Sequence, residues 1–503
     1  MIGTGALRQG RAESAAVIAA AAVIAATVGA LVAKAPIIGF GVTLGGVALA
    51  ALLVRPSRIP SVFLAALGII CLAYALGDRG IAYVGFGQVF MGEMVLALGV
   101  LAIVISLPRM KFGLLDALLI GFIALGAART IPYIGQYGID ALRDGVAWGY
   151  ALFAIAVAGT FRAQWFPTLV RAYRLLIPVM LVWFPVAIVS NVVAGSVIPH
   201  WPGAPVPIIY MKEGDAAVHL AAIAAFVLVG LYSSGPRLIR DGVVWALWFA
   251  DLAIAGTISR GGMLAAILGA GSSVLFVRSS ARMLQGAAIA IGFVVALYLV
   301  NPSVELGYKG RPVSFTQLVD NVASVVGDDR NGQLDTTREW RLAWWDKIVG
   351  YTLDGPYLWT GKGFGINLGD ADGFEVDSVG SLRSPHNGHL TLLARGGLPM
   401  LALWVLIQAS FAIGLIRAGI RASRSQPALL GIIAVLFAYW LAALINMSFD
   451  VYLEGPQGGI PFWSVIGLGM VAMRAARQAD QEVSPATAPA LRTPATAPSP
   501  SLT

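Results

Sequence analysis

Two histidines and an asparagine in the C-terminal half of the chain are well suited to chemistry. His386 and Asn387 end a long polar segment, and His389 lies just inside the apolar run that follows. A histidine has an unperturbed pKa of about 6.5, so it can accept a proton from a hydroxyl group at neutral pH. Asn387 can cap the first helical turn by accepting hydrogen bonds from backbone amides. His386 is therefore the first candidate for proton transfer, and His389 is the second.

Arg338 and Arg341 lie earlier in the same polar segment. From residue 336 onward the spacing predicts an amphipathic helix with Arg341 at the edge of an apolar stripe. The stripe consists of Leu342, Trp345, Ile348 and Val349. The tryptophans of this predicted helix are also typical of an anchor at the membrane surface. Guanidinium groups hold phosphate through paired hydrogen bonds, so the two arginines are candidates for binding a lipid-linked phosphate.

Arg260 is the third candidate arginine. It lies in Ser259-Arg260-Gly261-Gly262, which joins two apolar runs with almost no loop between them. An arginine near membrane depth usually faces a polar cavity or a partner. Asp251, about two and a half helical turns earlier, is a possible partner.

Alternate glycines follow the predicted amphipathic helix. Gly361, Gly363 and Gly365 permit close backbone approach and could offer amides to an anion, although a plain loop is an equal alternative. Gly363 and Gly365 are therefore counted with Arg338, Asn387 and His389 as candidate substrate-binding residues. The segment is neither a P-loop nor a dinucleotide-binding fingerprint.

An acidic cluster completes the polar segment. Asp370 and Asp372 have the Asp-x-Asp spacing with which some glycosyltransferases bind a divalent cation. A solvated acidic loop is the preferred interpretation, because an EF-hand would need a further oxygen ligand at the position of Phe374. We therefore expect no metal and no cofactor.

The elements that carry these residues are membrane helices. Of the 503 residues, 58% are hydrophobic and 12% are charged, which excludes an ordinary soluble domain. The net charge of +8 is spread over short loops between apolar runs, so it does not indicate binding of nucleic acid. The single cysteine, Cys71, excludes an intramolecular disulfide.

Apolar runs of spanning length predict an all-α polytopic membrane protein with about 12 to 14 transmembrane helices. The runs start near Ala15, Pro36, Pro60, Gly92, Gly113, Gly145, Leu169, Ala216, Gly242, Gly262, Gln285, Gly388, Ala428 and Pro461. Basic residues concentrate in alternate loops, which places those loops and both termini in the cytoplasm. The opposite loops, which face outward, are 80–88, 129–144, 191–215, 259–260, 301–385 and 448–459.

This topology divides the chain into four parts. Residues 1–300 carry transmembrane helices 1–11, residues 301–386 form a large periplasmic loop with short helices, and residues 387–475 carry the C-terminal helices. Residues 476–503, rich in Ser, Pro, Ala and Thr, are expected to form a disordered cytoplasmic tail.

Taken together, the motifs resemble the O-antigen ligase and polymerase superfamily of bacterial membrane glycosyltransferases. The resemblance covers residues 251–414 and rests on the order of the pieces. The pieces are Ser259-Arg260-Gly261, Arg341 with Trp345, the glycines 361, 363 and 365, and His386-Asn387 through Gly396-Gly397.

The resemblance implies an inverting, metal-independent transferase in the bacterial inner membrane. It would move a glycan from undecaprenyl diphosphate to an acceptor hydroxyl at the periplasmic face. Arg260 and Arg341 would bind the diphosphate, and His386 would be the general base. The implied partners are the lipid-linked glycan, a lipid A core or glycan acceptor, and membrane lipid.

Two alternatives stay open at this point. A polymerase for O-antigen or exopolysaccharide would use the same parts as a ligase. A flippase or transporter for a lipid-linked glycan would use cavity arginines to guide its substrate. The long outer loop favours an enzyme, because a transporter needs no such loop.

Overall fold

The computed structural model describes residues 56–86, 89–201, 206–233, 238–277, 279–300, 303–305, 312–314, 316, 319, 333–376 and 382–483. The described chain is almost entirely helical, which confirms the predicted all-α membrane class. Nine of the described helices are long and apolar enough to cross a membrane, or ten if one bent pair forms a single span. The two apolar runs predicted from Ala15 and Pro36 lie outside the described residues.

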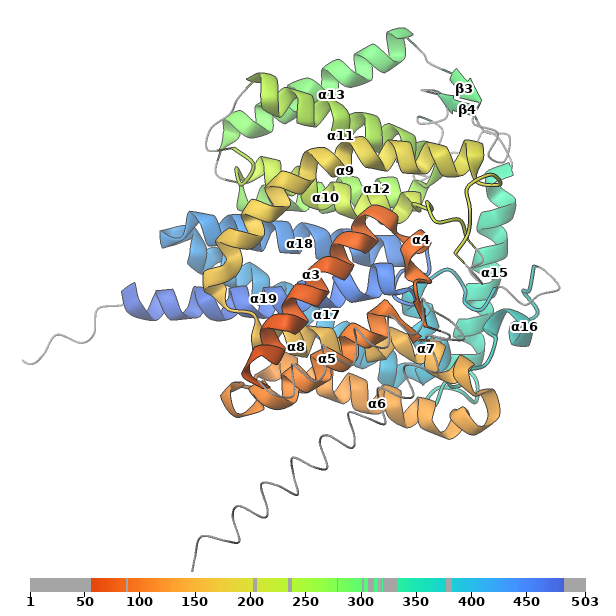
Figure 1. The fold of residues 1–503 in the computed structure, drawn as a ribbon. Coiled ribbons are helices and arrows are strands. Elements are labelled where there is room, and N and C mark those ends of the chain that lie inside the picture. Colours follow the sequence, from red (N-terminus) through yellow and green to blue (C-terminus); the bar gives the residue numbers. More distant parts are fainter. Residues whose placement is uncertain are drawn as a thin grey trace, which may run out of the picture.

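The N-terminal half of the described chain forms the spans on one side of the bundle (Figure 1). Its helices are α3 (Ile59–Gly77), α4 (Arg79–Ala82), α5 (Met91–Ser106), α6 (Leu114–Tyr137), α7 (Ile139–Gly149), α8 (Ala151–Thr160) and α9 (Phe166–Ala194). Its only described strands, β1 (Gly85–Phe86) and β2 (Val89–Phe90), form an antiparallel hairpin. Helices α7 and α8 are bent by 46° relative to one another, so the run predicted near Gly145 is either a broken span or a re-entrant loop.

The C-terminal half supplies the other spans and the outer elements. Its helices are α10 (Glu213–Leu228), α11 (Leu238–Ile258), α12 (Arg260–Ser272), α13 (Ser280–Val300), α15 (Gln333–Leu353), α16 (Leu368–Asp372), α17 (Gly388–Ser425), α18 (Pro427–Met447) and α19 (Pro456–Val483). Strands β3 (Ser303–Glu305) and β4 (Pro312–Ser314) form a second antiparallel hairpin. Each of the twelve runs predicted after residue 55 contains a helix, although α10 and α12 are short.

Helices α10, α12 and α18 pack closely in the middle of the bundle. Small residues make this possible: a Cβ atom at Gly269 of α12 would come within 2.7 Å of Ala442 Cβ and 2.9 Å of Ala221 Cβ. Helix α13 is peripheral by comparison. Gly286 is its only buried residue, so the described part of the chain leaves the other residues of α13 half-buried or exposed.

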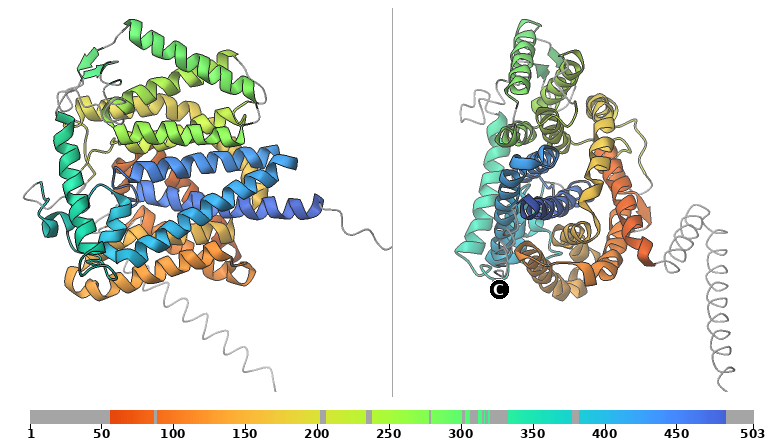
Figure 2. Two further views of the ribbon diagram at one scale, coloured as in Figure 1. Left: turned by 180° about the vertical axis from the view of Figure 1, so that it is seen from behind. Right: turned by 90° about the vertical axis from the view of Figure 1, so that its left-hand side faces the viewer.

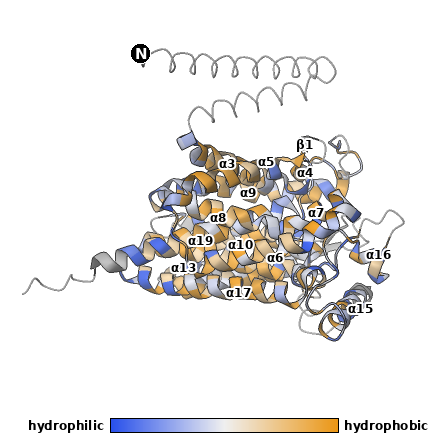
Figure 3. Ribbon diagram, turned by 90° about the horizontal axis from the view of Figure 1, so that it is seen from below, coloured by the Kyte–Doolittle hydropathy of each residue, from blue (hydrophilic) through white to orange (hydrophobic). Residues whose placement is uncertain are grey.

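Helix α15 lies across one end of the bundle, roughly perpendicular to the spans (Figures 1 and 2). The short outer elements α4, α7, α16 and the β3–β4 hairpin lie at the same end (Figure 1). Figure 3 shows hydrophobic residues along the spans and more hydrophilic residues around the ends. The described helices and strands of the predicted outer loops 80–88, 129–144 and 301–385 therefore lie at one end of the molecule. We call it the outer end; that it faces the periplasm remains a prediction.

The buried face of α15 differs from the predicted stripe. Ile348 is fully buried, as the stripe predicts, but Leu342 is 41% exposed, and Trp344 and Thr352, which lie outside the stripe, are fully buried. The Trp344 ring stacks on Phe374 with 5.3 Å between centroids. The helix therefore packs against protein on this face, and Trp344 is no membrane anchor.

Candidate active site

A short turn before α17 presents His386. As predicted, Asn387 caps α17, because its side chain accepts hydrogen bonds from the amides of His389 and Leu390 at 3.0 and 3.1 Å. His386 itself has a φ of +52°, a left-handed conformation that is uncommon outside glycine. Trp345 of α15 holds the turn by donating to the carbonyl of Pro385 at 2.9 Å. Helix α15 thus fixes the backbone that carries His386.

His386 faces Asp450, which lies in the turn between α18 and α19. The distance from His386 Nδ1 to Asp450 Oδ1 is 3.7 Å, which is an ion-pair distance when the imidazole is protonated. The other carboxylate oxygen of Asp450 pairs with the ammonium group of Lys212. Burial alone would raise the pKa of Asp450, but the charge of Lys212, the His386 side chain and the charge of Arg79 outweigh burial and hold this pKa well below its usual range. Asp450 therefore presents an ionised carboxylate to His386 at neutral pH.

Arg341 and Arg260 lie at the same turn. Arg341 donates to the carbonyl of Phe449 at 3.1 Å. Burial lowers the pKa of Arg341, the charge of Asp450 opposes that effect, and the charge of Arg260 adds to it. Gly261, next to Arg260, packs against Phe449, next to Asp450, which places Arg260 at the same turn. Residues from α12, α15 and the turns before α17 and α19 thus converge.

The two glycines after Arg260 explain how α12 comes so close to this turn. A Cβ atom at Gly261 would lie 2.8 Å from Phe449 Cβ, and one at Gly262 would lie 2.8 Å from the Cα atom of Gly214. Ser259 caps the helix by accepting from the Gly262 amide at 3.1 Å. The Ser259-Arg260-Gly261-Gly262 sequence therefore starts a helix directly against the turn that carries Asp450.

A second layer of charge surrounds Lys212. Its backbone amide donates to Asp78 Oδ2 at 2.6 Å. Arg79 is nearby: burial would lower its pKa, but the charges of Asp450, Asp215 and Asp78 outweigh burial and raise it. Burial and the charge of Asp215 raise the pKa of Asp78 well above its usual range. Arg79 and Lys212 thus add positive charge behind Asp450.

His389 lies on the inner side of α17. Its Nδ1 atom accepts a hydrogen bond from Trp404 Nε1 at 3.0 Å, and its Nε2 atom is 3.1 Å from Ser448 Oγ. An Nδ1 atom that accepts must be unprotonated, so the proton of the neutral ring is on Nε2. Both ring nitrogens are therefore engaged within the protein, unlike a base that faces a substrate.

The alternate glycines also make contacts within the chain. Gly361, Gly363 and Gly365 have φ values of +61°, +89° and +106°. A Cβ atom at Gly363 would lie 2.3 Å from the Tyr133 ring. The Gly363 amide donates to the Arg395 carbonyl, and the Gly365 amide donates to Asp144 Oδ2, both at 3.0 Å. The anion that the Gly365 amide meets in this structure is thus a carboxylate of the protein.

Arg395 joins this loop to two helices. Its side chain is 1% exposed, and it pairs with Asp144 of α7 at 2.8 Å. Its guanidinium also donates to the carbonyls of Ile366 and Arg383, at 3.1 and 3.2 Å. Arg383 pairs with Asp144 as well, at 3.0 Å. The network holds the chain just before His386 against α7 and α17.

The acidic cluster has a structural role at Asp372. Its side chain is fully buried, so the predicted solvated loop is wrong for this residue. Asp372 pairs with Lys362 and accepts hydrogen bonds from Trp344 Nε1 at 2.8 Å and from the Tyr351 hydroxyl at 3.3 Å. Within the described ranges, no group of three or more His, Cys, Asp or Glu side chains is placed to hold a metal ion.

Arg260 and Arg338 differ in their surroundings. The suggested partner of Arg260, Asp251, is buried, and neither of its carboxylate oxygens has a hydrogen-bond partner in the described part of the chain. That pairing is therefore wrong. Arg338 is exposed on α15, one turn before Arg341.

Neither Asp450 nor Lys212 is predicted as a site residue from the sequence alone. One signal was available for Asp450. The predicted outer loop 448–459 contains only two charged residues, Asp450 and Glu454, and it lies on the same predicted side as Arg260, Arg341 and His386. The sequence does not show how close these loops lie to one another in the folded protein.

Comparison with known proteins supports the resemblance. The O-antigen ligase family model matches residues 242–405. The match runs from α11 to the middle of α17 and includes Arg260, Arg341 and His386, whereas Asp450 and Lys212 lie outside it. No curated protein matches the chain at a significant level. Residues 242–405 therefore match an O-antigen ligase domain, and they lie within a multi-pass membrane protein.

Proposed function

We propose that the protein transfers an oligosaccharide or polysaccharide from undecaprenyl diphosphate to an acceptor hydroxyl at the periplasmic face of the bacterial inner membrane. The observation that carries this proposal is the convergence of Arg260, Arg341, His386 and Asp450 at one turn of the outer end. Both chain termini would be cytoplasmic. The reaction would invert the anomeric configuration and would need no metal.

The reaction would proceed in one displacement. His386 takes the proton of the acceptor hydroxyl, and the acceptor oxygen attacks the anomeric carbon of the donor sugar. The bond between that carbon and the diphosphate oxygen breaks, and its electron pair stays on the diphosphate. Asp450, 3.7 Å from His386 Nδ1, stabilises the imidazolium that forms and leaves Nε2 to face the acceptor.

Arg260 and Arg341 would act on the leaving group. The diphosphate gains negative charge as the glycosidic bond breaks, so fixed guanidinium groups stabilise the transition state more than the ground state. Removing one fixed donor of this kind costs about 2.7 to 4 kcal/mol. General base catalysis contributes about 10² to 10⁴ in rate. A rate factor of 10² to 10⁴ corresponds to about 2.7 to 5.4 kcal/mol, so the loss of one arginine should harm activity about as much as the loss of His386.

The acceptor separates two versions of this function. A ligase transfers the finished polymer to the lipid A core or another acceptor, and the description of the matched family favours this version. A polymerase instead adds the growing chain to the next lipid-linked repeat. In a deletion strain, loss of a ligase leaves long chains on the carrier lipid and a bare acceptor. Loss of a polymerase leaves an acceptor with at most one repeat.

The direct test uses purified protein in detergent, a lipid-diphosphate-linked glycan and an acceptor. We expect glycan transfer, with inversion at the anomeric carbon detected by NMR. His386→Ala is the matched inactive variant. Transfer in detergent would eliminate the flippase alternative, because no membrane is present to be crossed. An inactive preparation that still binds and transports the lipid-linked glycan in vesicles would favour the flippase.

A further inference from the structure

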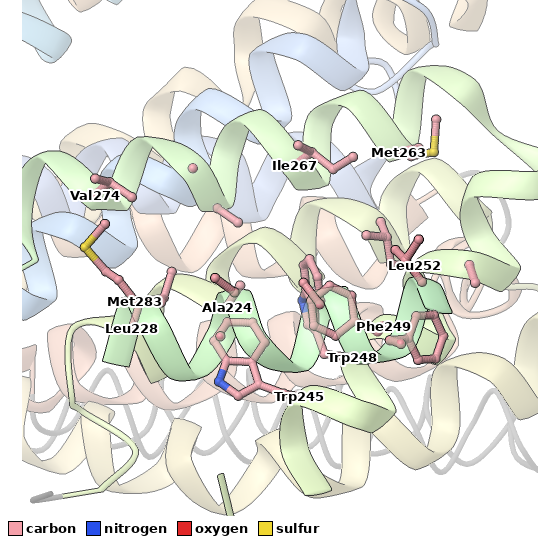
Figure 4. A pocket seen from close by; sticks show the side chains of 18 of the residues that line it. Ala224, Leu228, Trp245, Trp248, Phe249, Leu252, Met263, Ile267, Val274 and Met283 are labelled. Atoms are coloured by element: carbon pink, nitrogen blue, oxygen red, sulfur yellow. The ribbon is translucent and has the colours of Figure 1, made fainter. Parts of the chain in front are cut away.

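A groove of about 450 Å³ lies between α10, α11, α12 and α13 (Figure 4). Its lining is apolar. Trp245, Trp248 and Phe249 of α11 form one wall, and residues of α12 and α13 form the others. The indole nitrogen of Trp248 already donates to the Leu220 carbonyl at 2.7 Å. The groove therefore suits a hydrocarbon better than a polar ligand.

The groove is lined by the same face of α12 that carries Arg260 at its outer end. Met263, Ile267, Gly271 and Val274 line the groove, and they follow Arg260 at intervals of three or four residues. Such intervals place side chains on one face of a helix. Figure 4 shows Met263, Ile267 and Val274 in a row along the groove. From Met263 to Val274 the row is about 16 Å long at 1.5 Å per residue, which is about half the hydrocarbon thickness of a bilayer.

The groove is also accessible from the lipid phase. Its outer wall, α13, contributes only Gly286 as a buried residue. Ile267, Val274 and Val294 line the groove and are 45 to 49% exposed. A lipid chain could therefore enter sideways, without passing through the bundle.

We propose that this groove binds the polyprenyl chain of the lipid-linked donor, while Arg260 and Arg341 hold its diphosphate. This inference rests on the proposed function. The positive charge at the outer end of the α12 row selects an anionic head, and the apolar row beneath it receives the attached chain. Chain binding would align the diphosphate with His386 before reaction.

Gly271→Leu provides a test, because a Cβ atom at Gly271 meets nothing within 4 Å and the longer side chain would occupy the groove. Gly292→Leu is the matched control, since Gly292 of α13 also has open space around it but does not line the groove. Transfer is measured with a donor that carries a full-length polyprenyl chain and with one that carries two isoprene units.

For Gly271→Leu we expect KM for the long-chain donor to rise at least tenfold with little change in kcat. The short-chain donor should be used equally by all three proteins. Equal KM values for the long-chain donor in Gly271→Leu, Gly292→Leu and the unaltered protein would overturn the proposal.

A binding readout separates this inference from the proposed reaction. A photoreactive polyprenyl diphosphate without sugar should crosslink to α12 or α13 in the unaltered protein. Unlabelled polyprenyl diphosphate should compete for crosslinking, and phosphatidylglycerol should not. Equal competition by phosphatidylglycerol would show a site for bulk lipid and overturn the assignment. Specific crosslinking without any glycan transfer would support the groove and refute the proposed function.

Discussion

The imidazole of His386 and the carboxylate of Asp450 lie 3.7 Å apart, although 64 residues separate them in the chain. They belong to two turns at the outer ends of different helices, α17 and α19. Trp345 binds the carbonyl before His386, and Arg341 binds the carbonyl before Asp450. One helix, α15, therefore fixes the backbone on both sides of the pair.

The first prediction concerns this pair. Asp450→Asn should lower kcat at least tenfold, within the factor of about 10² to 10⁴ that a general base contributes. A neutral amide cannot stabilise the imidazolium form of His386. The control is Asp370→Asn, which changes an exposed carboxylate on α16 and should leave kcat unchanged. Equal kcat values for Asp450→Asn and the unaltered protein in a purified transfer assay would show that Asp450 has no part in the mechanism.

The second prediction compares the arginines with the histidine. Arg260→Ala and Arg341→Ala should each reduce kcat/KM by about as much as His386→Ala, because each removes about 2.7 to 4 kcal/mol of charge stabilisation and general base catalysis contributes a similar amount. Arg338→Ala should raise KM more than it lowers kcat, since Arg338 is exposed one turn away. Full activity of both Arg260→Ala and Arg341→Ala beside an inactive His386→Ala would refute the assignment.

The third prediction concerns pH and stability. The pKa of Asp450 is depressed in the folded protein, so this carboxylate stabilises the fold at pH values above its unfolded pKa of about 3.9. The stabilisation is lost as pH falls through the lower folded value. The Tm difference between the unaltered protein and Asp450→Asn should narrow as pH falls below about pH 4. A difference that stays the same or widens below about pH 4 would contradict the depressed pKa.

The fourth prediction tests the buried network at Arg395. Arg395→Met should destabilise the protein by about 3 to 5 kcal/mol, because it leaves Asp144 and two carbonyl groups with fewer partners in a buried site. Arg143→Met is the control. Arg143 also pairs with Asp144, but its side chain is 54% exposed, so its loss should cost less than about 1 kcal/mol. Denaturation followed by intrinsic tryptophan fluorescence would measure both.

The fifth prediction concerns metal removal. Asp372 already pairs with Lys362 and accepts from Trp344 and Tyr351, so it is poorly placed to serve a cation. Dialysis against a chelator should leave the transfer rate unchanged. A rate that collapses and is restored by a divalent cation would move Asp370 and Asp372 into the site.

The sequence predicts the spans well because each apolar run has to satisfy the same bilayer thickness. It also predicts the Asn387 cap, which depends on adjacent residues. Longer-range features are harder. The exposure of Leu342 and burial of Trp344 depend on how α15 packs on Phe374, and the Asp450 pairings depend on a turn in another part of the chain. The periodicity of one segment predicts neither the packing of α15 on Phe374 nor the pairings of Asp450.

The break in α17 has a consequence for protein engineering. At Gly397, with a φ of +70°, the helix is interrupted, and three backbone hydrogen bonds join its two sides to the outer loop. They run from the amide of Leu398 to the carbonyl of Leu358, from Lys362 to Ala394, and from Gly363 to Arg395, at 2.7, 2.7 and 3.0 Å. The loop thus supplies partners that a continuous helix would find within itself. A chimaera that exchanges the outer loop between transferases must therefore carry residues 358–363 and 394–398 together, or the recipient helix loses its own hydrogen bonds.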